Sequence, residues 1–277
     1  MRRNRQSRRA RPANRAAESE TRKGWLKIGL VGLAGVVVLG GYLMVSRGHR
    51  ALDPETLCPA EPASVVLLLV DVTDPMTVAQ RQDFQNQLAV LRNSIPRYGK
   101  LVVMKVDSAA DRLLEPVIVR CNPGRAEDVS EWTGNPGRVQ RMHAEEFVLP
   151  LNEAFTDLSR ASGSTRSPIL ESVQSAALTE LLAPEVQGLP RRLILASDLL
   201  QNTDTVSFYR GLPSAEAFVE SAAFRRVRTD LRDVEAEIWM LERSDTTRTQ
   251  PRALVDLWDA LLTAQGATVT RAYNVSG

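Results

Sequence analysis

The stretch SVVLLLVDVTDPMT, residues 64–77, decides the fold. Val65 to Val70 is an unbroken apolar run, which is typical of a strand buried on both faces of a parallel sheet. The run stops at Asp71, and Thr73 follows two residues later. Open α/β sheets tend to bind their ligands at the carboxyl ends of such strands, so the sequence predicts a ligand site at this point.

The rest of the chain alternates helical and strand-like patterns. Apolar residues recur with helical spacing in 75–94, 138–160, 169–182, 214–228 and 251–265, and strand-like runs occupy 100–106, 113–120, 191–198, 235–241 and 267–273. Pro116 favours an edge position for the strand that contains it. This alternation predicts a doubly wound, mostly parallel α/β sheet.

A long uncharged segment precedes the domain. Residues 28–46 are 19 residues without a charge, enough to cross a hydrocarbon core of ~30 Å. We expect a basic, disordered tail over 1–24, a transmembrane helix over 25–46, a juxtamembrane linker over 47–63 and the α/β domain over 64–277. A cleaved signal peptide is the alternative, but no small-residue cleavage site follows the apolar run.

The charge distribution predicts the orientation. The formal net charge of the chain is +2. The first 27 residues carry ten Lys and Arg against two Glu, an excess of +8, so residues 28–277 have a net charge of −6. The positive-inside rule keeps the basic tail in the cytoplasm. The domain is then extracytoplasmic, in the periplasm if the source is a Gram-negative bacterium with this chain in its inner membrane. The acidic balance of the domain gives no case for specific nucleic-acid binding.

The two cysteines, Cys58 and Cys121, are natural disulfide partners in an oxidising compartment. Two separate buried thiols are the alternative, which a cytoplasmic domain would favour. A disulfide would join the segment that enters the domain to a loop further along the sheet.

Three oxygen-bearing segments are expected at one edge of the sheet. They are Asp71 with Thr73, Ser167 at the start of a helix, and Asp198 at the end of the strand 191–198. Carboxylate and hydroxyl oxygens suit Mg²⁺, with Mn²⁺ or Ca²⁺ as alternatives. Capping is the structural alternative, because Asp74 before Pro75 and Ser167 before Pro168 have the pattern of helix N-caps.

At these residues the chain resembles the von Willebrand factor type A family, over about residues 62–275. The metal-ion-dependent adhesion site of that family has the pattern Asp-x-Ser-x-Ser, followed by a separate Thr and a later Asp. Asp71 matches the first acid, Thr73 the first hydroxyl, Ser167 the separate Thr and Asp198 the final acid. Pro75 replaces the second Ser, so the motif is degenerate. The resemblance implies a Rossmann-like fold and a protein-binding role, often with an acidic side chain of the partner completing the metal shell.

Four common catalytic and nucleotide-binding motifs are absent from the sequence. It has no Gly-x-Ser-x-Gly, His-Glu-x-x-His, Gly-x-x-x-x-Gly-Lys or Gly-x-Gly-x-x-Gly pattern. The remaining hypothesis of an enzymatic function is a Mg²⁺-dependent phosphoester hydrolase that uses Asp71 and Asp198. No small-molecule substrate is expected.

The sequence therefore predicts a membrane-anchored module that binds another protein at the carboxyl edge of its sheet, through a divalent ion held by Asp71, Thr73, Ser167 and Asp198. The loops of Asn135 and of Tyr209 and Arg210 are expected to form the rim of this site. A metal-free scaffold component of a membrane complex is the alternative.

Overall fold

The computed structural model describes residues 25, 27–42, 51–73, 75–108, 113–131, 134–158, 164–243 and 252–275. The chain divides into two compact units, residues 1–50 and 51–277. In the first unit, residues 27–42 are helical. Among the described residues, no helix combines the length and the apolar character that crossing a membrane requires. The transmembrane helix expected over 25–46 is not confirmed, and residues 43–46 lie outside the described part.

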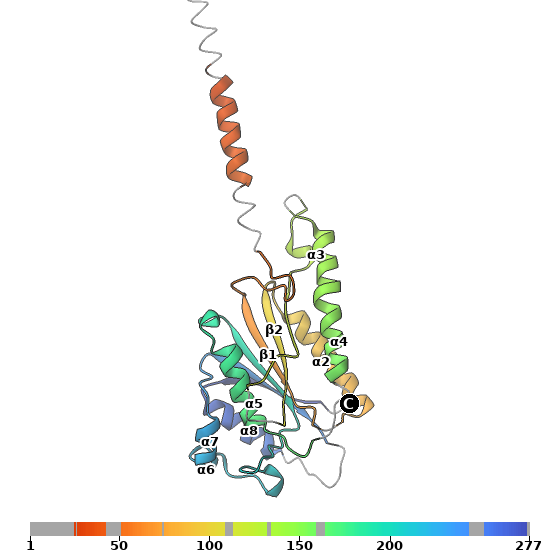
Figure 1. Ribbon diagram of the computed structural model, residues 1–277, viewed down its shortest axis with the longest axis vertical. Helices are drawn as coiled ribbons and strands as arrows, with labels where there is room; N and C mark the ends of the chain where they lie inside the picture. Colours follow the sequence, from red (N-terminus) through yellow and green to blue (C-terminus); the bar gives the residue numbers. More distant parts are fainter. Residues whose placement is uncertain are drawn as a thin grey trace, which may run out of the picture. The chain divides into compact units, whose positions relative to one another are not determined.

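The second unit is the predicted doubly wound sheet with helices on both faces (Figure 1). Its six strands lie in the order β3-β2-β1-β4-β5-β6, and all neighbours are parallel except β2 and β3. The strands are β1 Ser64–Val70, β2 Gly99–Lys105, β3 Ile118–Cys121, β4 Arg191–Ser197, β5 Val234–Leu241 and β6 Thr268–Val275. The helices are α2 Val78–Ser94, α3 Pro136–Met142, α4 Leu149–Leu158, α5 Ile169–Ala176, α6 Ala215–Val219, α7 Ala222–Val227 and α8 Ala253–Thr263.

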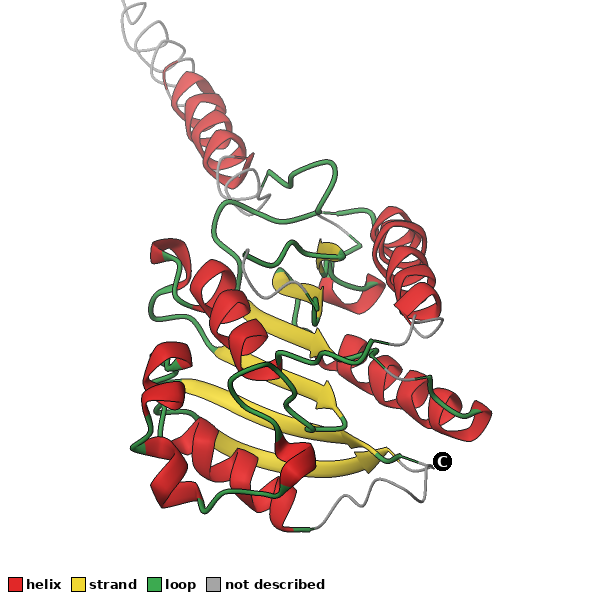
Figure 2. Cartoon of the chain, turned by 60° about the horizontal axis from the view of Figure 1, so that its bottom comes forward, coloured by secondary structure: helices red, strands yellow, loops and turns green. Residues whose placement is uncertain are grey.

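Strand β1 is central and divides the core in two. Successive side chains of a strand point to opposite faces of the sheet, and Val65, Leu67 and Leu69 belong to one apolar cluster, with α5 and α8. Val66, Leu68 and Val70 belong to the other, with α2 and α4. Figure 2 shows the two helical layers that enclose the sheet. The unbroken apolar run therefore reflects burial on both faces, as predicted.

The first helix begins later than the sequence pattern indicated. Helix α2 starts at Val78, and its N-cap is Thr77, whose Oγ1 accepts from Gln80 N while Gln80 Oε1 accepts from Thr77 N. This reciprocal pair is a capping box. Pro75 therefore precedes the cap, and the expected cap Asp74 lies outside the described residues.

Two expected helices are not regular. Residues 138–160 were predicted as one helix. The structure has α3, a π-helical segment His143–Val148 and α4 in direct succession. Residues 214–228 form α6 and α7 rather than one helix, because Ser221 caps a new helix by accepting from Phe224 N.

The segment that enters the sheet belongs to the compact unit. Residues 51–63, expected as part of a linker, lie in the same unit as the sheet. Leu57 is buried and Ala63 N donates to Tyr98 O at 2.9 Å. Cys58 forms a disulfide with Cys121 at the end of β3, as predicted.

Candidate functional site

The predicted acids converge beside the middle of the sheet. Strands β1 and β4 are neighbours, and the chain leaves them toward opposite sides of the sheet, to β2 and to β5. Such a reversal is the topological switch point at which open α/β sheets bind ligands. Asp71 directly follows β1 and Asp198 directly follows β4, so both carboxylates lie at this point.

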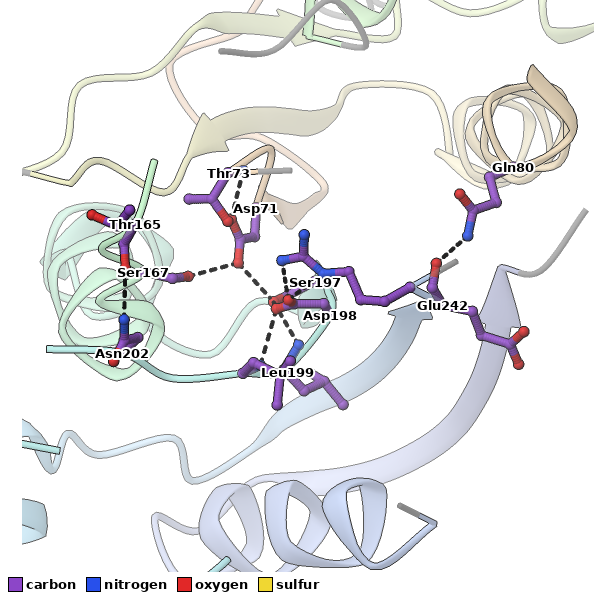
Figure 3. A network of polar contacts seen from close by, with 12 residues as sticks. Asp71, Thr73, Gln80, Thr165, Ser167, Ser197, Asp198, Leu199, Asn202 and Glu242 are labelled. Atoms are coloured by element: carbon purple, nitrogen blue, oxygen red, sulfur yellow. Dashed lines mark hydrogen bonds and ion pairs between the residues drawn. The ribbon is translucent and has the colours of Figure 1, made fainter. Parts of the chain in front are cut away.

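Asp71 is held by three hydrogen bonds from its own chain. Its Oδ1 accepts from Thr73 N at 3.0 Å. Its Oδ2 accepts from Ser167 Oγ at 2.8 Å and from Ser197 Oγ at 3.0 Å. Figure 3 shows these residues around the carboxylate of Asp71, a residue that is only 4% exposed. The donors stabilise a buried negative charge that would otherwise be costly.

Ser167 reaches Asp71 because its backbone is fixed. Its N–H donates to Asn202 O and its carbonyl accepts from Asn202 N, both at 2.9 Å. Asn202 Nδ2 also donates to Thr165 O at 2.6 Å. Helix α5 has no side-chain cap, and its N-cap position is Pro168. The capping interpretation of Ser167 is therefore wrong, since its hydroxyl binds Asp71 instead.

Asp198 forms an ion pair with an arginine. Arg243 Nε donates to Asp198 Oδ2 at 2.6 Å, and Arg243 Nη2 contacts the same oxygen. Asp198 Oδ1 accepts from Leu200 N at 3.0 Å. The side chain of Asp198 is 3% exposed and that of Arg243 11%. The pair is therefore largely withdrawn from water, where separating the two charges is strongly unfavourable.

The backbone next to Arg243 is fixed from two sides. Gln80, the capping-box residue of α2, donates through Nε2 to Glu242 O (Figure 3). On the other side, Glu242 N donates to Val275 O of β6 at 3.3 Å. The start of α2 and the last strand together hold the residue that precedes Arg243.

The structure brings together Asp71, Ser167 and Asp198. Thr73 contributes its backbone N–H to Asp71, and it also lines an adjacent cavity of about 270 Å³ together with Lys105, Asp107 and Ser164. The turn Phe208–Arg210, with Tyr209 and Arg210, follows the loop after β4 and is tied to it by Phe208 N, which donates to Gln201 O.

Asn135 is not at this edge. Strand β3 runs antiparallel to β2, so Cys121 pairs with Lys100 at the start of β2. The following loop therefore begins at the amino edge, where Tyr98 N donates to Asn122 O and Arg97 Nη1 donates to Asp128 O. Asn135 is the N-cap of α3, whose Gln140 side chain contacts this loop at Ala126 N.

The residues present do not fit a divalent ion. Mg²⁺ requires about six oxygen ligands in octahedral geometry. Every carboxylate oxygen of Asp71 and Asp198 already accepts from a donor of the chain, and Pro75 has no hydroxyl to add. Among the described residues, nowhere do three or more His, Cys, Asp or Glu side chains group as a metal site would require. The guanidinium of Arg243 would also repel an incoming cation.

Sequence reasoning missed Ser197 and Arg243. Ser197 is fully buried as the last residue of β4. A hydroxyl residue at the end of an apolar strand, directly before an acid, could have indicated this role. Arg243 follows the adjacent strand β5 by two residues. An acid directly behind a buried strand needs a partner for its charge, and a basic residue behind the neighbouring strand could have been considered for that role.

The only described histidine is elsewhere in the fold. His143 is buried in the π-helical segment beside Phe147, with 5.5 Å between ring centroids. Burial, with the nearby Arg125 and Arg92, lowers its pKa, and Asp128 opposes the shift. It is absent from the network around Asp71 and Asp198, which contains no histidine, cysteine or lysine.

Comparisons with known proteins find structural but not sequence similarity. No family model matches the sequence, and no curated protein is significantly similar to it. The structure is similar to the conserved hypothetical protein BatB from Bacteroides thetaiotaomicron, with a TM-score of 0.40, 11% identity, and coverage of 76% of this chain and 91% of that one.

It is also similar to an aerotolerance-related membrane protein from Bacteroides fragilis, crystallised with multiple mutations to serines. Here the TM-score is 0.37 and the identity 9%, over 77% of this chain and 92% of the other. At these values neither similarity carries an argument about function.

Proposed function

We propose that this chain is a membrane-anchored von Willebrand factor type A-like module that binds a protein partner at the carboxyl edge of its sheet without a divalent ion. One observation carries the proposal. Two buried carboxylates meet at the switch point between β1 and β4, and donors of the chain already engage all their oxygens. A carboxylate held in this way is poorly suited to act as a nucleophile or general base. The network therefore supports a rigid binding surface rather than catalysis.

Exposed apolar side chains surround this edge. Val78 begins α2, Leu113 lines the cavity beside Thr73, and Tyr209 lies in the turn after the β4 loop, and all three are exposed. Protein interfaces combine apolar and aromatic contacts at their centre with polar groups at the rim. This distribution supports a protein partner over a small charged ligand.

The disulfide and the N-terminal segment support an extracytoplasmic location. The Cys58–Cys121 bond requires an oxidising compartment to form and persist. Residues 28–46 are uncharged and follow an arginine-rich tail, the arrangement that retains the tail in the cytoplasm. We place the module on the outer side of a bacterial inner membrane.

Site-specific photocrosslinking of the full-length chain in its source cells tests the proposal. A photoreactive residue replaces Val78, Leu113 or Tyr209 in three variants. Three control variants carry it at Val90, Leu149 or Leu178, which are also exposed and lie in the C-terminal half of α2, at the start of α4 and in the segment Ala177–Leu181. We expect the same partner protein, identified by mass spectrometry, from the three edge positions. Adducts that form only from the control positions would contradict the proposed face.

A further inference from the structure

We propose that Arg243 is the resident cation of the carboxyl-edge site, and that its guanidinium excludes a divalent ion from the acids that would otherwise hold one. Asp71, Pro75, Asp198 and Arg243 line one shared hollow at the ends of β1, β4 and β5. The inference shares the absence of a divalent ion with the proposed function, but it does not depend on a protein partner, because it concerns what neutralises this site and not what binds to its surface.

The hollow is too small to enclose a hydrated ion. Its volume is about 20 Å³, and a single water molecule already needs roughly 10–15 Å³ on this measure. Mg²⁺ usually keeps several water molecules in its coordination shell. With Arg243 in place, the hollow has room for about one water and none for an ion with its remaining ligands.

The charge at Asp198 is already compensated. Arg243 Nε and Nη2 both contact Asp198 Oδ2, which leaves that oxygen poorly able to coordinate a metal. A guanidinium is always protonated and presents its donors as a planar fork that matches a carboxylate. A dication bound to the same carboxylate would lie against a fixed positive charge. Unlike a bound metal, this cation cannot be removed by a chelator.

The position of Arg243 is built into the fold. Gln80 and Val275 bind the backbone of Glu242, the residue directly before it. Ser197 Oγ lies 3.0 Å from Asp71 Oδ2 and 3.5 Å from Asp198 Oδ1, so one hydroxyl separates the two acids. Removing the guanidinium would leave two neighbouring buried carboxylates without this counter-charge. A pair of that kind attracts a divalent cation.

Metal binding by the purified full-length chain tests the inference. Isothermal titration with Mn²⁺ and Mg²⁺ is run on the wild type, on Arg243→Lys, on Arg243→Ala, and on Arg243→Ala combined with Pro75→Ser. We expect no saturable binding by the wild type or by Arg243→Lys, which keeps a positive charge. The Arg243→Ala variant should gain one site for Mn²⁺, and the added hydroxyl of Pro75→Ser should tighten it. Adding Asp198→Ala should abolish the gained site.

If Arg243→Ala folds too poorly for titration, its melting temperature is measured with and without Mn²⁺ instead. Rescue of its melting temperature by Mn²⁺, but not by the same concentration of NaCl, supports the inference. Arg226→Ala is the matched control, because Arg226 is an exposed arginine of α7, and this variant should gain no site. One equivalent of Mn²⁺ bound by the wild type and lost in Asp71→Ala would overturn the inference. So would a folded Arg243→Ala variant without metal binding, or one left unfolded at every Mn²⁺ concentration.

Discussion

Ser167 Oγ donates a hydrogen bond of 2.8 Å to Asp71 Oδ2, joining residues 96 positions apart in the sequence. The bond links the end of the central strand to the segment before α5, and both residues are buried. The hydroxyl stabilises a carboxylate that is largely withdrawn from water, so it contributes to folding as well as to the shape of the site.

Ser167→Ala should therefore destabilise the domain. Asp71 Oδ2 loses one of its two hydroxyl donors, and a hydrogen bond to a charged group contributes about 1.5–3 kcal/mol. Urea denaturation followed by circular dichroism measures the change. Thr165→Ala is the control, because its side chain is exposed and only its carbonyl accepts from Asn202. Equal stability of the two variants would show that the hydrogen bonds from Ser197 and Thr73 are enough to stabilise the carboxylate of Asp71.

Gln80→Glu should separate the two roles of Gln80, which caps α2 through its Oε1 and binds the Glu242 carbonyl through its Nε2. A glutamate can still accept from Thr77 N, as in other capping boxes, but it has no amide N–H to donate to Glu242 O. The carbonyl loses its partner, at a cost of about 1–3 kcal/mol. Thermal unfolding should show a lower melting temperature.

Gln82→Glu is the matched control for this prediction. Gln82 is exposed and lies in the first turns of α2, so the substitution adds the same charge near the same helix end. A negative charge there is neutral or slightly stabilising. A melting temperature lowered equally in both variants would attribute the effect to charge and not to the contact with Glu242.

Breaking the disulfide should destabilise the domain strongly. The bond closes a loop between residues 63 positions apart, and the chain-entropy relation gives about 4 kcal/mol for a loop of this length. Cys58→Ser, Cys121→Ser and the double variant should unfold at the same lower urea concentration, and reduced wild type should match them. A wild type whose stability is the same with and without reductant would contradict this prediction.

The order of the elements was predictable because most strands are marked by apolar runs. Runs such as Val65 to Val70 are long enough that burial on both faces is the simplest explanation, and the structure confirms it. Pro116 correctly indicated that the strand near it lies at the edge. Those features are local, so one sequence is enough to recognise them.

The errors concern features that local patterns do not encode. The spacing of apolar residues does not indicate whether β3 runs parallel or antiparallel to β2. Because β3 is antiparallel, the loop that leads to Asn135 begins at the amino edge of the sheet. The ion pair of Asp198 with Arg243 depends on β4 and β5 being neighbours in register. Sequence reasoning therefore found the acids of the site and not the arginine that neutralises one of them.

The pKa of His143 predicts how stability depends on pH. Burial lowers this pKa below its ordinary value of 6.5, and Arg125 from the loop and Arg92 from α2 lower it further, while Asp128 opposes them. The unfolded chain then binds a proton at a higher pH than the folded chain does. The stabilisation is complete above pH 6.5 and is lost as the pH falls from that value through the lower pKa of the folded protein.

Urea midpoints measured from about pH 8 to about pH 5 should therefore fall more steeply for the wild type than for His143→Gln, whose side chain does not titrate. The difference between the two curves isolates this histidine from the carboxylates that also begin to titrate at the acid end. His49→Gln is the control, since His49 precedes the compact unit that starts at Ala51, and its curve should follow the wild type. Parallel curves for the wild type and His143→Gln would mean that the folded protein holds the charged imidazole as readily as the unfolded chain does.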